Sequence, residues 1–344
     1  RCMLYKKISV GRSFVETPLR EDQAQAARDS LSKFLYALLF SWLVQRINST
    51  LKVCTDDETP SSCSLGILDI AGFECFEHNS LEQLFINLSN EHLQAHFNNH
   101  MFKSELDDYA AEGIEVGSGL AFNDNSDVVT LIDSRGGILA LLDEEVSMPK
   151  ATDQTFVSKV IKTLAEHPRL IAPKIAGSKF GIRHFAGEVQ YTVDGFLEKN
   201  IDKPPDEAPT LFQASSLSVL QEIGNKIAAE LAEVTGGPGK KKAQKTVSSN
   251  FRLSLASLVE KLNQAEPHFI RCIKPNAEKV PNTFTSKLVM EQLMCSGVFE
   301  AVRIRQSGFA ARIPFKEFVG RFKMVLPKAK QEAIFSLKSP EAKD

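Results

Sequence analysis

The chain has 344 residues and a mass of 38.1 kDa. At about 150 residues per domain, this length predicts two or three structural units. A hydrophobic fraction of 43% and a charged fraction of 24% exclude collagen-like, largely disordered and disulfide-scaffold classes. The 41 basic and 43 acidic residues give a net charge of −2, so an electrostatic partner, including nucleic acid, must bind a local patch rather than the chain as a whole.

Three further features bear on where the protein works. The longest apolar stretch, Phe34–Val44, is about half the roughly 20 residues that span a bilayer, which predicts no membrane segment. Six scattered cysteines without a CxxC pair favour reduced thiols in a cytoplasmic protein over disulfides or zinc. The first residues, Arg1–Lys7, do not start with methionine and carry no signal-peptide core, so we interpret the chain as the middle of a longer polypeptide.

The N-terminal part of the chain predicts an α/β fold. A helix is expected to begin near Thr17 and Pro18, which offer a cap and a helix-starting proline. Its apolar face repeats at spacings of three and four at Leu31, Phe34, Leu35, Leu38, Leu39, Trp42 and Leu43. A polar loop then leads into the apolar run Ser64–Ile70, which has the length of a strand buried on both faces.

A second long helix follows. Asn79 and Glu82 form a capping-box pattern, and helical spacing continues to about Tyr109. Such a helix is about 45 Å long at about 1.5 Å per residue, long enough to carry a displacement across a domain. His92 and His96 lie four positions apart on it, but the residues between them include no glutamate, so we interpret them as packed or solvated rather than as metal ligands.

The rest of the chain contains shorter elements. From about 128 to 195 short helices and strands should alternate, with a β-like stretch at 179–193. Residues 235–249 combine three glycines and four lysines with no acid and predict a basic surface loop. A helix at 253–262, a sheet strand at 268–273 and a helical run at 286–305 follow, the run being interrupted at Gly297.

Residues at the end of the predicted strand carry candidate chemistry. Asp69 lies there, with Gly72 three positions on and Glu74 five positions on. A carboxylate in this place can hold a water on Mg²⁺, and a glycine amide can approach a terminal phosphate closely. The D-x-x-G pattern alone also fits a strand followed by an ordinary tight turn.

The longer context closely resembles the myosin motor domain. Switch II and the relay helix of that family are similar to three stretches of this sequence, namely 68–74 (LDIAGFE), 79–84 (NSLEQL) and Asn90-Glu91. Further similar stretches, in the family's order, are 102–105, 112–115, 137–139, 142–145, 149–153, 185–189, 195–200 and 267–276. The resemblance therefore covers nearly the whole chain.

The resemblance implies a fragment of the P-loop-type myosin motor fold, in which a central mixed sheet is flanked by long helices and joined to a mostly helical lower 50-kDa subdomain. The expected parts are a long helix region leading to the sheet (1–63), the switch II strand and loop (64–78), the relay helix and loop (79–118), the lower 50-kDa actin-binding subdomain (119–234), a basic loop similar to myosin loop 2 (235–249), a helix, sheet strand and hinge helices (250–308) and the start of the converter (309–344).

The resemblance also assigns roles at the nucleotide site. Asp69, Gly72 and Glu74 would be catalytic, and Asp69, Ile70, Ala71 and Gly72 would bind Mg-ATP. Asp69 would reach Mg²⁺ through a water, Gly72 would bind the γ-phosphate, and Glu74 would pair with a switch I arginine outside this chain. The sequence contains no G-x-x-x-x-G-K-[ST] motif, so the P-loop and switch I are expected upstream, and this fragment alone is expected to be inactive.

The expected partners are an actin filament and ATP or ADP. Actin contacts are implied for Met148, Pro149, Lys150, Lys240, Lys241, Lys242, Lys245, Leu258, Asn263 and His268. Composition alone favours a solvated linker for the lysines, and the resemblance favours actin contact. The periodicity of 255–273 suits an internal helix and strand as well as it suits an actin-binding segment. Gly297 and Gly308 are the expected hinges.

The sequence thus predicts part of an ATP-driven, actin-based cytoskeletal motor of the cytoplasmic myosin complex, in which ATP hydrolysis and phosphate release move a converter. A calmodulin-like light chain on a lever arm outside this chain is a further expected partner. The alternative from another class is a non-catalytic, actin-binding pseudo-motor with a degenerate P-loop.

Overall fold

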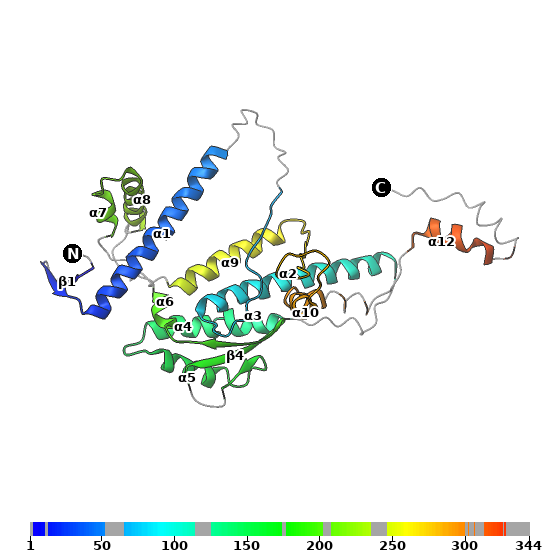
Figure 1. Ribbon diagram of the computed structural model, residues 1–344, viewed down its shortest axis with the longest axis horizontal. Coiled ribbons are helices and arrows are strands. Elements are labelled where there is room, and N and C mark those ends of the chain that lie inside the picture. Colours follow the sequence, from blue (N-terminus) through cyan, green and yellow to red (C-terminus); the bar gives the residue numbers. More distant parts are fainter. Residues whose placement is uncertain are drawn as a thin grey trace. The chain divides into compact units, whose positions relative to one another are not determined.

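The computed structural model describes residues 3–10, 13–51, 65–113, 125–173, 177–201, 208–234, 246–299, 302, 306, 313–325 and 327. These residues are mostly helical and form two small sheets (Figure 1). The chain divides into two compact units. The first comprises 1–92, 126–184 and 188–265, and the second comprises 93–125, 185–187 and 266–344. No helix among the described residues is long and apolar enough to cross a membrane.

A β-hairpin opens the first unit. β1 (Tyr5–Val10) pairs antiparallel with β2 (Ser13–Pro18), with Tyr5 opposite Pro18. This hairpin is not among the elements predicted from the sequence, although two strand-like runs separated by only two residues are a hairpin signal. The helix expected near Thr17 and Pro18 begins instead at Glu21, because both residues pair with β1.

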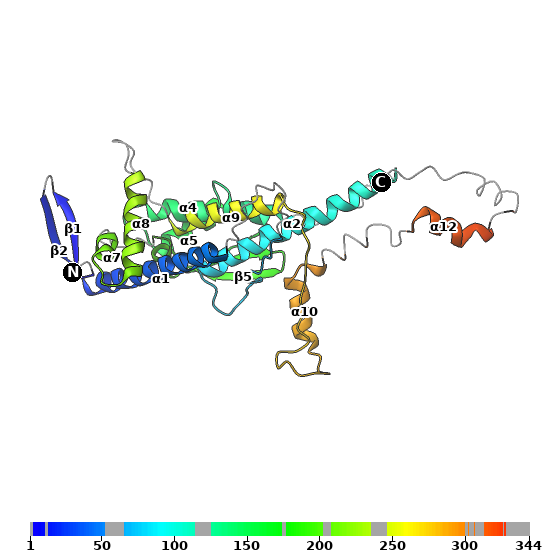
Figure 2. The same ribbon diagram turned by 90° about the horizontal axis from the view of Figure 1, so that it is seen from above.

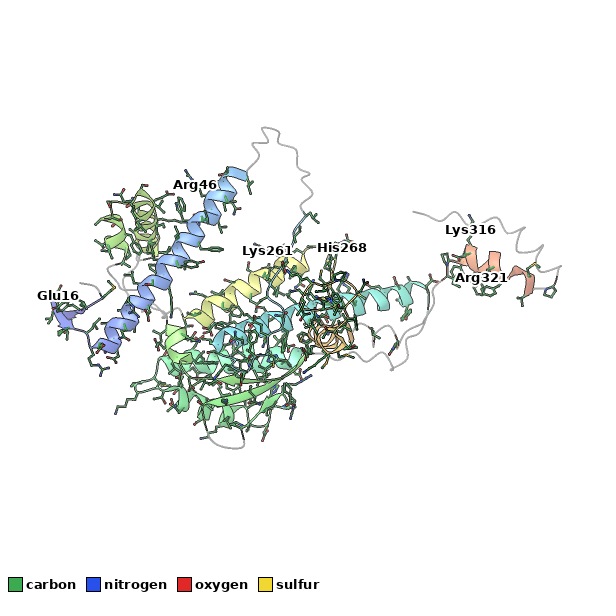
Figure 3. All side chains as sticks on the ribbon, in the orientation of Figure 1. Glu16, Arg46, Lys261, His268, Lys316 and Arg321 are labelled. Carbon is green, nitrogen blue, oxygen red and sulfur yellow. The ribbon has the colours of Figure 1, made fainter. Side chains whose placement is uncertain are left out.

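The long helix α1 (Glu21–Leu51) packs against α7 (Ala208–Gln213) and α8 (Ser218–Val234). Five of its predicted apolar positions face this small core, namely Leu31, Phe34, Leu35, Leu38 and Trp42. Leu39 and Leu43 are exposed. The described residues therefore cover only part of the apolar face predicted for this helix. Near the end of α1, where Arg46 also lies (Figure 3), Lys226 Nζ donates to Gln45 Oε1 at 2.7 Å.

The main core of the first unit is built from the alternating elements predicted for 128–195. They are α3 (Ser126–Asp133), α4 (Ile138–Val146), α5 (Asp153–Thr163), β3 (Leu170–Ile171), β4 (Lys179–His184), β5 (Gly187–Thr192) and α6 (Phe196–Ile201). The predicted helix at 253–262 is α9 (Val247–Asn263), which adds Leu255 to this core. The prediction of short alternating helices and strands is confirmed.

The three-stranded sheet has the order β3–β4–β5. β3 is antiparallel to β4, with Leu170 opposite Ile182, and only two residues connect β4 to β5. Side chains on one face are buried in the core, and two of these are polar, His184 on β4 and Tyr191 on β5. A buried polar side chain must find hydrogen-bond partners.

The helix α2 (Leu81–Ala111) confirms the second predicted long helix, but its cap differs from the prediction. Gln83 Oε1 accepts a hydrogen bond from the Ser80 N–H at 2.9 Å, one residue after the predicted position. Asn79 instead accepts from the Phe76 N–H at 2.8 Å and donates to the Gln190 C=O at 3.0 Å. Asn79 therefore joins the turn before α2 to β5.

The second unit contains α2 beyond His92, α10 (Ser286–Cys295), α12 (Phe315–Phe322) and the 3-10 helix η1 (Lys323–Val325). Gly297 follows α10 with φ +67°, a left-handed conformation that glycine adopts easily, so the predicted interruption there is confirmed. The second predicted hinge, Gly308, lies outside the described residues.

The predicted central mixed sheet is not formed by the described residues. Residues 65–70, predicted as a buried strand, are irregular, and Leu65 and Ile67 are each 90% exposed. Residues 268–273 are also irregular, and Ile270 is 84% exposed. An extended segment becomes a strand only where a neighbour pairs with its backbone. Neither segment has such a neighbour within the described part of the chain.

Asp133 at the end of α3 ties this helix to α2 and α9. Arg252 donates from its guanidinium to Oδ1 and, at 2.5 Å, to the backbone C=O of Asp133. His92 Nε2 lies 3.7 Å from Oδ2. Burial acts to raise the pKa of Asp133, but the nearby His92 and the hydrogen-bonded Arg252 outweigh it and hold that pKa below its ordinary value.

Replacing Asp133 by Asn should lower the free energy of unfolding by about 1–3 kcal/mol near neutral pH, because a charge-assisted hydrogen bond is lost. A carboxyl with a lowered pKa stabilises the folded state above its unfolded pKa of about 4, and this contribution disappears as the pH falls through the folded value. Urea titrations of both proteins should therefore show a difference that shrinks as the pH falls below the unfolded pKa of about 4. A pH-independent difference would contradict this assignment.

Candidate functional site

The segment that carries the D-x-x-G pattern, 65–78, is held by side chains of α2. Asn87 pairs with the backbone of Glu74 in both directions, since its Oδ1 accepts from the Glu74 N–H and its Nδ2 donates to the Glu74 C=O, each at 2.8 Å. Asn90, one turn further along α2, donates to the Ala71 C=O at 3.0 Å. α2 therefore fixes this segment on both sides of Gly72.

Gly72 itself faces open space. Within the described ranges, no heavy atom outside Gly72 and its two chain neighbours lies within 4 Å of the position that a side chain would take, and Asp69 is exposed. Mg²⁺ usually keeps several waters and binds one or two carboxylates together with phosphate oxygens. An exposed carboxylate three residues before a glycine whose side-chain position is open fits the predicted role of 69–72 towards Mg-ATP. Among the described residues, no group of three or more His, Cys, Asp or Glu side chains could hold a metal ion.

The residues after Gly72 are inserted into the first unit. The Phe73 ring packs against the core and meets the His184 ring edge-on, with centroids 5.3 Å apart. The partly buried Glu74 carboxylate accepts a hydrogen bond from Gln83 Nε2 at 3.2 Å. Phe73 and Glu74 are therefore half-buried and held by the first unit, whereas Gly72 before them and Cys75 after them are exposed.

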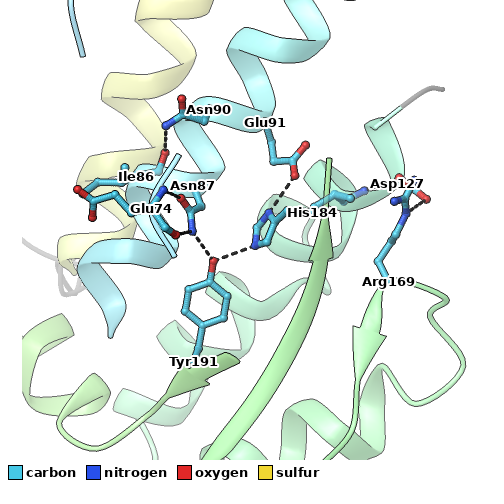
Figure 4. Close-up of polar contacts among 10 residues, drawn as sticks. Glu74, Ile86, Asn87, Asn90, Glu91, Asp127, Arg169, His184 and Tyr191 are labelled. Carbon is cyan, nitrogen blue, oxygen red and sulfur yellow. Dashed lines mark hydrogen bonds and ion pairs between the residues drawn. The ribbon is translucent and has the colours of Figure 1, made fainter. Parts of the chain in front are cut away.

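A chain of buried hydrogen bonds joins α2 to the sheet (Figure 4). Asn87 Nδ2 donates to Tyr191 Oη at 2.9 Å, and Tyr191 Oη lies 2.8 Å from His184 Nε2. His184 Nδ1 lies 2.9 Å from Glu91 Oε1, and both of these side chains are completely buried. Because Asn87 and Glu91 are one turn apart on α2, the chain leaves the helix, crosses β5 and β4, and returns to the helix.

One proton arrangement satisfies every group in this chain. Burial, together with the nearby Glu91, raises the pKa of Tyr191 far above its ordinary value, and the hydroxyl keeps its proton. Since Tyr191 accepts from Asn87, its own O–H can donate to His184 Nε2. His184 then carries its proton on Nδ1 and donates it to Glu91. A shift of α2 along the sheet would break several of these bonds at once.

The predicted contacts at 148–150 form a fixed, exposed turn between α4 and α5. Met148 is 53% exposed, and Lys150 has a positive φ of 65°. The Met148 N–H donates to the Glu145 C=O at 2.9 Å, and the Glu145 carboxylate accepts from Thr155 Oγ1 at 2.6 Å. Thr152 caps α5 with a full capping box. The turn therefore presents Met148, Pro149 and Lys150 on a rigid base.

The other predicted contact residues are placed differently. On α9, Leu258 is half-buried and Asn263 is exposed, so only part of this helix faces solvent. His268 belongs to the second unit, is exposed and lies 3.9 Å from the Glu266 carboxylate. Lys240, Lys241, Lys242 and Lys245 lie outside the described residues.

Sequence reasoning found Asp69, Gly72 and Glu74 but assigned no role to the residues that hold them. Asn87, His184 and Tyr191 had no assigned role, and Asn90 and Glu91 entered only as part of a motif. One signal in the sequence could have indicated these residues: several amide and carboxyl side chains interrupt the apolar face on the first turns of α2. Their partners on β4 and β5 lie about a hundred residues away and leave no local pattern.

The comparisons with known proteins identify the family. The family model described as myosin head (motor domain) matches residues 1–343. The chain belongs to the myosin head family. Myosin-11 from Arabidopsis thaliana is 42% identical over 316 residues, covering 92% of this chain and 20% of that protein. Myosin-J heavy chain from Dictyostelium discoideum is 40% identical over 343 residues, covering 95% of this chain and 15% of that protein. The chain thus spans a fifth or less of the length of these relatives.

In this myosin head chain, Tyr191→Phe should lower the free energy of unfolding by about 1–3 kcal/mol, because it leaves the buried Asn87 amide and His184 ring without their shared partner. Tyr36→Phe on the exposed side of α1 is the matched control and should change stability by less than about 0.5 kcal/mol. Urea titration measures both. Equal stability of the two variants would show that the buried chain does not hold α2.

Proposed function

We propose that this chain is the C-terminal half of a myosin motor domain, from just after switch I to the start of the converter, in an ATP-driven motor that moves on actin. Family membership and the order of the quoted motifs support this assignment. The observation that carries it is the open Gly72, which lies between Ala71 and Glu74, two residues bound by side chains of the same 31-residue helix.

In this proposal the stretch 69–72 is one wall of the nucleotide site, and the P-loop and switch I supply the other walls. The Gly72 N–H donates to the γ-phosphate of ATP. Asp69 would hold a water bound to Mg²⁺. The metal ion, when bound, neutralises charge on the phosphate oxygens.

The same contacts give a route for movement. When phosphate leaves, Gly72 loses a hydrogen bond, and the neighbouring residues shift. Because Asn90 holds Ala71 and Asn87 holds Glu74, this shift is transferred to the first turns of α2. A continuous helix moves as one body, so we infer that α2 carries the displacement towards the proposed converter, 309–344.

Glu74 has a separate role in this proposal. Its carboxylate is held by Gln83 in the described chain and would pair with a switch I arginine when the site closes for hydrolysis. Such a contact forms only in the closed state and should affect the chemical step more than nucleotide binding.

Glu74→Ala in the full-length protein should slow the hydrolysis step on the order of 100-fold while changing ATP affinity by less than about threefold. Glu77→Ala, an exposed neighbour, is the control and should leave both values near those of the wild type. Single-turnover kinetics separate the two steps. An unchanged hydrolysis step would refute the role of Glu74, and a full-length wild type that hydrolyses no ATP would favour the pseudo-motor.

An actin filament is the proposed macromolecular partner. The rigid turn with Met148, Pro149 and Lys150 supports this proposal, since an exposed apolar side chain beside a cation suits a protein surface that is both apolar and acidic. The four lysines of 235–249 would add long-range attraction to an acidic filament. A calmodulin-like light chain and a place in the cytoskeletal myosin complex rest on the family alone.

Replacing Lys240, Lys241, Lys242 and Lys245 by alanine should slow association with actin by about tenfold at low salt and flatten its salt dependence, because exposed charges act at long range and are screened by ions. Replacing the same four residues by arginine keeps the charge and should preserve both properties. Stopped-flow binding across a salt series is the measurement. An unaltered rate and salt slope would identify the segment as an inert linker.

A further inference from the structure

A buried polar junction joins three helices of the first unit around Asp143. This residue lies on α4, and its Oδ1 accepts from Asn200 Nδ2 of α6 at 3.0 Å. The same oxygen accepts from Thr246 Oγ1 at 2.6 Å and from Ser248 Oγ at 2.5 Å, both at the start of α9. Asn200 Oδ1 in turn accepts from the Ser248 N–H at 2.8 Å. Asn200 and Ser248 are completely buried.

The junction fixes the first turn of α9. Thr246 is the N-cap of this helix, and its Oγ1 accepts from the Ser249 N–H at 3.1 Å while donating to Asp143. A cap residue normally satisfies only the helix that it begins. Here the cap residue also donates to a carboxylate of another helix. If the start of α9 shifted on α4, buried polar groups would lose their hydrogen-bond partners.

The two helices joined in this way both carry proposed actin contacts. α4 and α9 lie side by side (Figure 2). α4 continues into the rigid turn that presents Met148 and Lys150, five and seven positions after Asp143. α9 carries Leu258 and Asn263. A partner that touches both segments binds more tightly if their relative position is fixed before binding.

We propose that Asp143 is a positioning residue for filament binding, which holds the start of α9 against α4 and so fixes the position of α9 relative to α4 and the turn at 148–150 before the filament binds. The inference rests on the proposed actin contact. It assigns Asp143 no contact with actin or nucleotide, and its effect passes through Thr246, Ser248 and Asn200.

Three variants of the full-length protein separate positioning from general stability. Asp143→Ala removes the acceptor of three hydrogen bonds. Asp143→Asn keeps an oxygen that can accept the same three hydrogen bonds, and should therefore preserve the junction in weakened form. Asp127→Ala is the matched control. It removes a partly buried ion pair, 2.7 Å long, between Asp127 on α3 and Arg169, which immediately precedes β3. Neither residue belongs to the Asp143 junction.

Two measurements apply to each variant: hydrogen exchange of the amides at 246–250, and the actin concentration that half-saturates binding. Asp143→Ala should speed exchange at these amides and raise the half-saturating concentration about three- to tenfold, as expected when a few groups must be ordered on binding. Asp143→Asn should lie between the wild type and Asp143→Ala in both measurements, because a neutral oxygen keeps the three bonds without their charge assistance. Asp127→Ala should change neither by more than about twofold.

Unchanged exchange at 246–250 in Asp143→Ala would overturn the junction itself. Faster exchange with no weaker actin binding than in Asp127→Ala would overturn the positioning role, provided that Met148→Ala weakens binding. Met148→Ala leaves the junction intact and tests the actin surface directly. If it and Asp143→Ala both leave actin affinity unchanged, the proposed actin contact fails at this surface, and the positioning role fails with it.

Discussion

The position of α2 on the three-stranded sheet is set by the burial of its polar side chains. Asn87 and Glu91 are fully buried on the same helix as the core residues Leu84 and Leu88. A buried amide or carboxylate without partners costs about 2–7 kcal/mol or more, so α2 can dock only where β5 offers Tyr191 and β4 offers His184. Apolar packing tolerates small adjustments, whereas this hydrogen-bond chain is satisfied at one position only.

The fixed position of α2 explains the form of the segment around Gly72. Asn79, Asn87 and Asn90 all come from the same end of this helix or the turn before it, and each binds backbone groups. An amide side chain offers a donor and an acceptor together, which is what an unpaired stretch of backbone requires. The anchors on the segment end at Ala71, and Asp69 beyond them is exposed. One part of the segment therefore follows the helix, and the other is open to a ligand.

The sequence predicted those features that depend on local pattern. The periodicity of α2 and the alternation between 128 and 195 were read correctly because each element contributes its own apolar face to the core. The prediction of a strand at 64–70 was wrong, since residues 65–70 are irregular. A strand forms only where a second strand pairs with its backbone, and an apolar run does not specify that partner. At the site, Asp69 and Gly72 were found through their spacing. Tyr191 and His184 were missed because they meet α2 residues 104 and 93 positions away.

The two polar junctions of the first unit differ in a way that suits different tasks. Asn87 holds Glu74 through a neutral amide, and such bonds contribute only about 0.5–1.5 kcal/mol each. Asp143 holds Thr246, Ser248 and Asn200 through one charged oxygen, and charge-assisted bonds are roughly twice as strong. At the first junction Asn87 is buried but its partner Glu74 is only half-buried, whereas at the second junction Thr246, Ser248 and Asn200 are all buried. In the proposed motor, this difference would suit an adjustable joint at Gly72 and a rigid joint at the start of α9.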